Sequence, residues 1–304
     1  MIRIYLIKQD FANTRLDRWF KKNVCEIPQS LIEKNIRKGK IKVNNIKKKS
    51  SYKVQKDDQI TVNNFYPTVD KNKKIKEKYK ASNKEIISTS QFVIADNENF
   101  IVINKPAGIA VQSGTKSKKN ILDILSKTKY FKNSFPYTVH RIDKDTTGVL
   151  IIAKNRKYAQ LFTSLFRIRK IHKTYLGVVL GEFEKQKGTF NDILYFYEGE
   201  KKIKAKAITH FKVLDSSNNY SLLKLNPETG RKHQLRRQLL MHDHPILGDS
   251  KYRISDNYKN KKNTLMLHAY KINFSINGKR FEFAAEPTVA FKRALKEKYL
   301  KSFW

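Results

Sequence analysis

Residues 139–155 read VHRIDKDTTGVLIIAKN, and this stretch decides much of the fold. Its second half contains VLIIA at 149–153, which is apolar at every position rather than at every second one. That pattern predicts a strand covered on both faces. The polar half must then lie at the edge of a core, where Gly148 suits a close approach of two backbones and the loop can hold a carboxylate rigidly. Taken alone, an arginine followed by two aspartates is better explained as a surface ion pair.

Further short apolar segments after residue 90 also follow the pattern of strands. FVIADNENFIVINKPAG contains two strands joined by a polar turn, and KTYLGVVLGEF and YSLLKLNPETG each contain one more. Near the end, KINFSINGKRFEF predicts a hairpin with Asn277 and Gly278 in a type I′ turn. Strands outnumber helices, and many are joined by hairpins. The fold class we expect is therefore α+β, with a largely antiparallel mixed sheet flanked by helices and loops.

The charge of the chain is its strongest compositional signal. Of 304 residues, 64 are lysine or arginine and 27 are aspartate or glutamate, a formal net charge of +37. Part of this excess is to be discounted, because the chain is also rich in asparagine and isoleucine, which share A/T-rich codons with lysine. Even so, a folded protein tolerates such self-repulsion most easily against a polyanion, so we expect RNA or DNA as the partner.

The composition also points to a cellular compartment. The single cysteine, Cys25, excludes an intrachain disulfide and a multi-cysteine zinc site, which fits a reducing environment. No apolar run is long enough to span a bilayer, and the start of the chain, MIRIYLIKQDF, has no signal-peptide cleavage site. We expect a soluble cytoplasmic protein that does not interact with a membrane.

The first part of the chain predicts a separate small domain. NTRLDRWFKKNV and PQSLIEKNIRKGKIKVN each predict a helix by the spacing of their apolar residues, and Gly39 is well placed to end the second. Arg37, Lys38 and Lys40 crowd the end of that helix, and strand-like pieces follow. A lysine run alone is best explained as a solvated face. Two short helices, the second basic, followed by a small sheet nevertheless resemble the S4 RNA-binding module, which implies contacts with RNA phosphates and shape.

Five segments in order resemble one enzyme family. HRIDKDTTG and its apolar strand resemble the active-site motif of the RluA-family pseudouridine synthases, His-Arg-Leu-Asp, two residues, Thr-Ser-Gly. NKPAGIAV, KTYLGVVLG, TGRKHQLRRQLLMHDHPILGDSKY and LHAYKINF resemble the family's other motifs. With the S4-like front end, the resemblance covers nearly the whole chain, and the front end is most similar to the RluC-like branch that acts on large-subunit ribosomal RNA.

The resemblance assigns roles to four residues. The family's catalytic aspartate falls on Asp143, and the tyrosine that stacks on the target base falls on Tyr175. The arginine that pairs with the carboxylate falls on Arg236, and the arginine that fills the gap left by the flipped nucleotide falls on Arg141. Asp145 falls on a variable position and receives no role.

These residue types suit the reaction that the resemblance implies. Pseudouridine forms when the C1′–N1 bond of uridine breaks, the uracil rotates and its C5 joins C1′, with no redox change and no group lost. No cofactor and no metal are therefore expected. An ionised carboxylate can attack as a nucleophile or remove a sugar proton, and the residues leave open which of these Asp143 does. The target base must leave the stack, and Tyr175 is expected to hold it.

Other residues have simpler explanations. We expect Arg231 and Lys105 to contact RNA, although Lys105 also suits a role in shaping the loop beside the site. An isolated tyrosine such as Tyr175 is more often an ordinary strand residue than a catalytic one. His233, His242 and His244 invite a metal interpretation, but His-x-His without further ligands is a weak pattern, and within the family's pattern these histidines belong to the fold.

The sequence departs from the family pattern at a few positions. Ile142 and Thr147 replace leucine and serine and preserve their character, whereas Gln112, Arg237 and Gln238 stand where relatives often have histidine, valine and histidine. The last three put details of the substrate pocket in doubt, not the aspartate.

We therefore expect three parts: an S4-like RNA-binding domain at 1–65, a basic linker at 66–90 and a pseudouridine synthase domain at 91–304. The protein is expected to act as a monomer, without an obligate protein partner, on large-subunit ribosomal RNA. The alternatives are the same chemistry on transfer RNA and a non-catalytic ribosome-associated RNA-binding protein. A Ser-His-Asp hydrolase is disfavoured because no Gly-x-Ser-x-Gly elbow is present.

Overall fold

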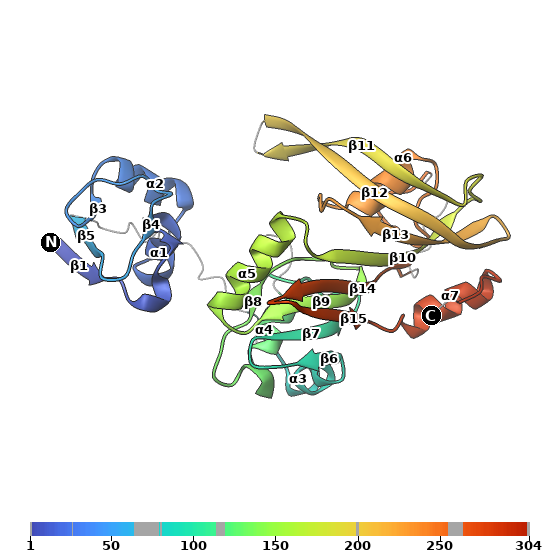
Figure 1. Ribbon diagram of the computed structural model, residues 1–304, viewed down its shortest axis with the longest axis horizontal. Helices are drawn as coiled ribbons and strands as arrows, with labels where there is room; N and C mark the ends of the chain where they lie inside the picture. The colour runs from blue at the N-terminus through green and yellow to red at the C-terminus, as the bar shows by residue number, and fades with distance from the viewer. Residues whose placement is uncertain are drawn as a thin grey trace. The chain divides into compact units, whose positions relative to one another are not determined.

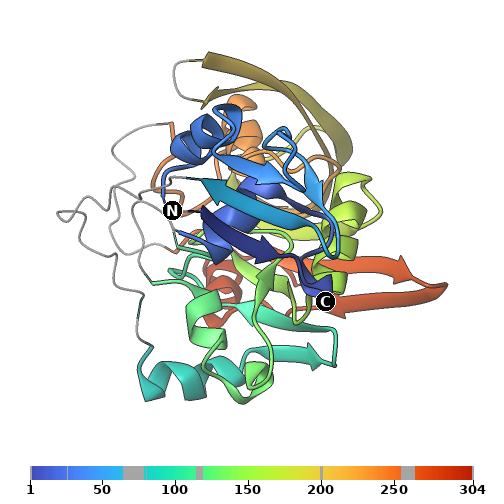
Figure 2. The same ribbon diagram turned by 90° about the vertical axis from the view of Figure 1, so that its left-hand side faces the viewer.

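The computed structural model describes residues 2–25, 27–63, 79, 81–113, 119–198, 201–254 and 264–302. The chain divides into two compact units, Met1–Glu77 and Lys78–Trp304 (Figures 1 and 2). Within the described ranges, no helix combines the length and the apolar content needed to cross a membrane.

The first unit contains two helices and a small antiparallel sheet. The helices cover a core to which Phe20, Ile32 and Ile36 contribute fully buried side chains. Gly39 has φ +73°, the left-handed conformation with which a helix commonly ends, as the sequence predicted. The three-stranded sheet has the order β1-β5-β3, and β2 pairs with β4. The elements are β1 Ile2–Leu6, η1 Gln9–Phe11, β2 Thr14–Arg15, α1 Leu16–Asn23, α2 Gln29–Arg37, β3 Ile41–Val43, β4 Lys53–Val54 and β5 Gln59–Asn63.

The second unit is built on one large sheet, which confirms the expected fold class. Its strands follow the order β11-β12-β13-β10-β14-β9-β7-β6, with β15 paired to β14 and β8 to β9 (Figure 1). Every pairing is antiparallel except that of β14 with β9. The strands are β6 Val93–Asp96, β7 Phe100–Lys105, β8 Tyr137–Thr138, β9 Thr147–Ala153, β10 His172–Leu180, β11 Lys187–Glu198, β12 Lys201–Ser217, β13 Tyr220–Pro227, β14 Leu267–Ile276 and β15 Lys279–Ala284.

Helices cover the two faces of this sheet. Leu239 of α6 and Phe291 of α7 pack into one core with β10 and β13, and Phe162 of α5 packs into another with β9 and β14. The helices are α3 Asn83–Ser90, α4 Ile121–Leu125, α5 Arg156–Arg167, α6 Gln234–Met241 and α7 Val289–Glu297, and a 3-10 turn, η2, spans Lys129–Phe131.

Helix α3 corrects the expected linker at 66–90, because it lies within that segment and belongs to the second unit. It begins with a capping box, in which Ser82 Oγ accepts from the backbone of Glu85 and the Glu85 carboxylate accepts from the backbone of Ser82. Composition alone missed this helix because a cap, rather than an apolar run, stabilises its first turn. Residues 64–78 and 80 of the expected linker lie outside the described residues.

Strand β9 is buried along its whole length, as its apolar run predicted. Val149 and Ile151 face one core cluster, and Leu150 and Ile152 face another, so both sides of the strand are covered. At its start, Gly148 has φ +108°, and a Cβ there would lie 2.1 Å from the carbonyl oxygen of Ala269. The parallel contact of β9 with β14 therefore requires glycine, and it holds the preceding polar loop against the sheet.

Candidate active site

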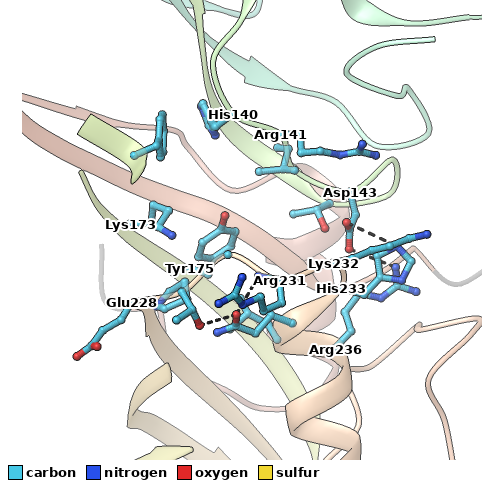
Figure 3. Close-up of a pocket in the computed structure, with 18 of the residues that line it drawn as sticks. His140, Arg141, Asp143, Lys173, Tyr175, Glu228, Arg231, Lys232, His233 and Arg236 are labelled. Atoms are coloured by element: carbon cyan, nitrogen blue, oxygen red, sulfur yellow. Dashed lines mark hydrogen bonds and ion pairs between the residues drawn. The ribbon is translucent and has the colours of Figure 1, made fainter. Parts of the chain in front are cut away.

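A pocket of about 720 Å³ opens beside the polar loop that precedes β9. Its wall combines that loop, strand β10, the end of α5, and the segment that joins β13 to α6 (Figure 3). The volume lies in the range of ordinary ligand sites. The polar side chains that line it include His140, Arg141, Asp143, Lys173, Tyr175, Arg231, His233 and Arg236.

Asp143 meets Arg236 across this pocket. Oδ2 of Asp143 lies 3.4 Å from Nη1 of Arg236, and the two side chains are 23% and 7% exposed. The tighter partner of Arg236 is Asp249, whose two carboxylate oxygens accept from Nε and Nη2 at 2.6 and 2.7 Å. Burial opposes the charge of Arg236, but Asp249, and to a smaller extent Asp143, raise its pKa. A permanently charged guanidinium, held in place by Asp249, thus faces the Asp143 carboxylate.

His233 lies on the other side of the same carboxylate. Its Nε2 is 3.7 Å from Oδ1 of Asp143, and its Nδ1 is 3.0 Å from the hydroxyl of Tyr252. Burial lowers the pKa of His233, although the charge of Asp143 opposes this, so the neutral ring is favoured. When the Tyr252 hydroxyl donates to Nδ1, the ring proton sits on Nε2 and faces the carboxylate.

Tyr175 comes from β10, between the partner strands β13 and β14. Burial, together with the negative charge of Asp143, raises the pKa of Tyr175, which keeps its hydroxyl protonated at neutral pH. In Figure 3 its ring stands in the pocket wall between Lys173 and Asp143. A flat ring in this position offers a surface on which a base can stack.

The pocket also contains two of the cations that the sequence singled out. Arg141 and Arg231 both line it and are both exposed. Nε of Arg231 donates to the carbonyl of Lys206, which ties its segment to β12. Arg37, Lys38 and Lys40 belong to the other unit, where all three are exposed at the end of α2.

Lys105 contradicts its predicted RNA contact. Its side chain is 0% exposed, and Nζ donates to the carbonyls of Pro106, Ile109 and Lys144 at 2.7, 3.0 and 2.9 Å. Burial lowers the pKa of Lys105 to about 7, although Asp145 and Asp143 oppose this. All three donors of the ammonium group are used, so Lys105 shapes the loop beside Asp143, as the alternative interpretation held.

Replacement of Lys105 by methionine is expected to lower the rate of product formation about 10- to 100-fold, because the carbonyl beside Asp143 loses its donor and the loop shifts. The slope of log Kd for RNA against log salt should stay unchanged. Arg231→Gln is the matched control, since Arg231 is exposed at the pocket and loss of a phosphate contact reduces that slope by about one. Filter binding across a salt series checks both variants. An equal reduction of the slope in Lys105→Met would show that Lys105 contacts RNA directly.

Sequence reasoning missed four residues of the site: His140, Lys173, Asp249 and Tyr252. Each lies within a quoted motif, but the sequence does not indicate which carboxylate forms an ion pair with Arg236. One signal could have pointed to two of them: Asp249 and Tyr252 stand at the end of the quoted segment TGRKHQLRRQLLMHDHPILGDSKY, which also contains Arg236. His233 was assigned to the fold alone, and the structure brings it to Asp143.

The other histidines of that motif serve the fold. His242 lies 3.2 Å from Asp192, and Nδ1 of His244 donates to the carbonyl of Leu180. Among the described residues, no three histidine, cysteine, aspartate or glutamate side chains gather as ligands for a metal ion.

A carboxylate beside a buried arginine, close to a tyrosine in a pocket with exposed cations, defines an enzyme site for an anionic substrate. Residues 99–241 match the family described as RNA pseudouridylate synthase. Ribosomal large subunit pseudouridine synthase C of Buchnera aphidicola is 31% identical over 97% of this chain and 96% of its own length. The protein of the same name from Rickettsia felis is 34% identical over 90% of this chain and 93% of its own length. The chain belongs to the RNA pseudouridylate synthase family and is an isomerase that acts on uridine in RNA.

Solved structures show the same fold. Human RNA Pseudouridylate Synthase Domain Containing 4 superposes with a TM-score of 0.62 and 25% identity, over 71% of this chain and 96% of that one. Human RNA Pseudouridylate Synthase Domain Containing 1 has a TM-score of 0.55 and 20% identity, over 64% of this chain and 82% of that one. The second likeness concerns the fold alone.

Proposed function

We propose that this enzyme converts specific uridines of large-subunit ribosomal RNA to pseudouridine, with Asp143 as the catalytic group. The relatives that match nearly the full chain carry ribosomal large subunit in their names, which supports this substrate. The observation that carries the catalytic assignment is the placement of Asp143 in the pocket beside Arg236, which is itself fixed by Asp249. A partly exposed carboxylate held against a guanidinium can reach a bound nucleotide.

The chemistry assigns a distinct task to each group. Asp143 attacks C1′ or removes a proton from the ribose, which breaks the C1′–N1 bond. The freed uracil rotates against the ring of Tyr175, C5 bonds to C1′, and the hydrogen on C5 leaves as a proton. Arg236 contacts the carboxylate and restricts its movement. Arg141, exposed at the pocket, occupies the gap that the flipped nucleotide leaves in its stack.

Tritium release tests the reaction and the substrate together. RNA labelled with tritium at uridine C5 loses that hydrogen when the new C–C bond forms. Large-subunit RNA, small-subunit RNA and transfer RNA are each incubated with the enzyme, and release from the first alone is expected. Release only from transfer RNA would shift the substrate assignment. No release from any of them, as free RNA or as assembled subunits, would favour an RNA-binding protein without this chemistry.

We also propose that the first unit is an S4-like module that binds RNA. Its support is the exposure of Arg37, Lys38 and Lys40 at the end of α2, after two short helices. Within the described part of the unit, none of these side chains forms an ion pair, so they are available to phosphates.

Replacement of these three cations by glutamine is therefore expected to weaken RNA binding and to reduce the salt slope of log Kd by about 2–3. Filter binding over a salt series measures this. A matched triple variant of exposed lysines elsewhere in the unit, Lys21, Lys22 and Lys56, should change the slope less. Equal slopes in the two variants would contradict the S4-like assignment.

The monomeric state and the cytoplasmic location are also proposals. One chain by itself brings Asp143, Tyr175 and Arg236 to the same pocket, which supports the proposal of a monomer. Sedimentation at the concentration of the activity assay checks this point, and fractionation of cells checks the location.

A further inference from the structure

A second group of nitrogen-bearing side chains lines the pocket, and Figure 3 shows one of them, Lys173, on the other side of Tyr175 from Asp143. The group consists of Lys173, Arg169 and His140. Lys173 precedes Tyr175 by two residues on β10, and both side chains line the pocket.

Lys173 is the central member of this group. Its side chain lines the pocket and is only partly exposed, yet no described carboxylate forms an ion pair with it. Burial, and the nearby charge of Arg169, lower the pKa of Lys173 to about 8. A half-buried ammonium group without an anion is unfavourable, and it suits a site that an anionic ligand completes.

The neighbours of Lys173 add further donors. Nε2 of His140 accepts the backbone N–H of Ile151, so the proton of the neutral ring sits on Nδ1. Burial, with the charge of Lys173, lowers the pKa of His140 to about 3, so the ring stays neutral at physiological pH. The ring is also fixed by stacking on Phe166, with 4.6 Å between centroids.

Arg169 occupies an unusual backbone position. It follows the end of α5 with φ +59°, a left-handed conformation that glycine usually fills at the end of a helix. Its Nη1 lies 4.0 Å from the carboxylate of Glu228, which is also 2.7 Å from His210. Glu228 thus also contacts His210, and its 4.0 Å approach to Arg169 leaves guanidinium donors for another group.

We propose that Lys173, together with Arg169, binds a backbone phosphate of the RNA next to the uridine that is modified. The inference rests on the proposed function. Uracil carries no charge, whereas the RNA chain supplies an anion beside every base, so a phosphate matches a cation site next to the ring of Tyr175. The phosphate contact would fix the register of the strand, and so decide which nucleotide reaches Asp143.

The test couples the lysine to one phosphate. A synthetic fragment of large-subunit RNA that the wild type modifies is prepared with a single uncharged methylphosphonate 5′ or 3′ of the target uridine. Lys173→Met should lower kcat/KM on the natural fragment about tenfold or more. One methylphosphonate should lower the wild-type value by a similar factor and have little further effect on Lys173→Met.

The matched control is Lys224→Met, which removes an exposed lysine of the neighbouring strand β13 that does not line the pocket. This variant should keep the full methylphosphonate penalty. If every methylphosphonate lowers kcat/KM by the same factor for Lys173→Met as for the wild type, the phosphate contact does not exist. The same conclusion follows if Lys173→Met and Lys224→Met behave alike.

Two further measurements keep the outcome decisive. Should circular dichroism show that Lys173→Met does not fold, Arg169→Gln takes its place, with a smaller loss expected at the same phosphate. Should the wild type release no tritium from any RNA, the proposed function fails, and the coupling is then tested by the Kd values of wild type and Lys173→Met for a bound RNA oligonucleotide that carries one methylphosphonate at each position in turn. The two failures are therefore distinguishable.

Discussion

Replacement of Asp143 by asparagine is expected to lower the rate of pseudouridine formation by at least about 10³-fold, because the amide neither attacks C1′ nor accepts a proton from the ribose. RNA affinity should change little. The substitution keeps the size of the side chain, and Arg236 retains its pair of short hydrogen bonds to Asp249. Single-turnover tritium release measures the rate, and filter binding measures the affinity.

Asp145→Asn is the matched control for this experiment. It removes one negative charge two residues further along the same loop, without touching Arg236. Its rate should remain close to that of the wild type. A variant of Asp143 that loses binding and turnover in parallel, or one that keeps its turnover, would contradict the assigned role.

The second large effect is expected on stability. Asp249→Ala removes the two short hydrogen bonds that Asp249 makes with the buried guanidinium of Arg236. The longer 3.4 Å contact with Asp143 is the ion pair that remains. Removal of one partner from a buried ion pair costs about 3–5 kcal/mol of unfolding free energy. Product formation should fall as well, because Arg236 is no longer held in position behind the pocket.

Hydrogen exchange resolves this effect within the second unit, by the protection of amides in β9 and α6. The control is Glu282→Ala, which breaks the exposed pair of Glu282 with Lys271 and should change protection little. Equal protection in Asp249→Ala and the wild type would show that the buried pair does not stabilise this unit.

Much of the catalytic unit was predictable from local pattern. VLIIA at 149–153 predicted a strand covered on both faces, and the structure shows that strand between two cores. Asn277 and Gly278 predicted a hairpin turn and have φ values of 51° and 77°, which a type I′ turn requires. Both features depend on neighbours in the chain, so the sequence carries them directly.

The long hairpin of β11 and β12 was not predicted. Ile193 and Tyr195 are exposed on one face of β11, while Leu194 is buried and the ring of Phe196 lies under the guanidinium of Arg237 on α6. An exposed face that mixes apolar and lysine residues hides the alternation on which strand prediction depends. Arg237, one of the departures from the family pattern, therefore helps to hold this hairpin on α6.

The sequence by itself determined the reaction class and the alternation of strands, and it singled out Asp143 as the proposed catalytic group, because these depend on residue types and on spacing along the chain. The tertiary structure alone decided how charges are paired and which of them are buried. Lys105 and Lys173 are both lysines within family motifs, yet one is enclosed by three carbonyls and the other faces the pocket. Burial and pairing arise where distant segments meet, as those of Asp143 and Arg236 do, and such contacts leave no local pattern.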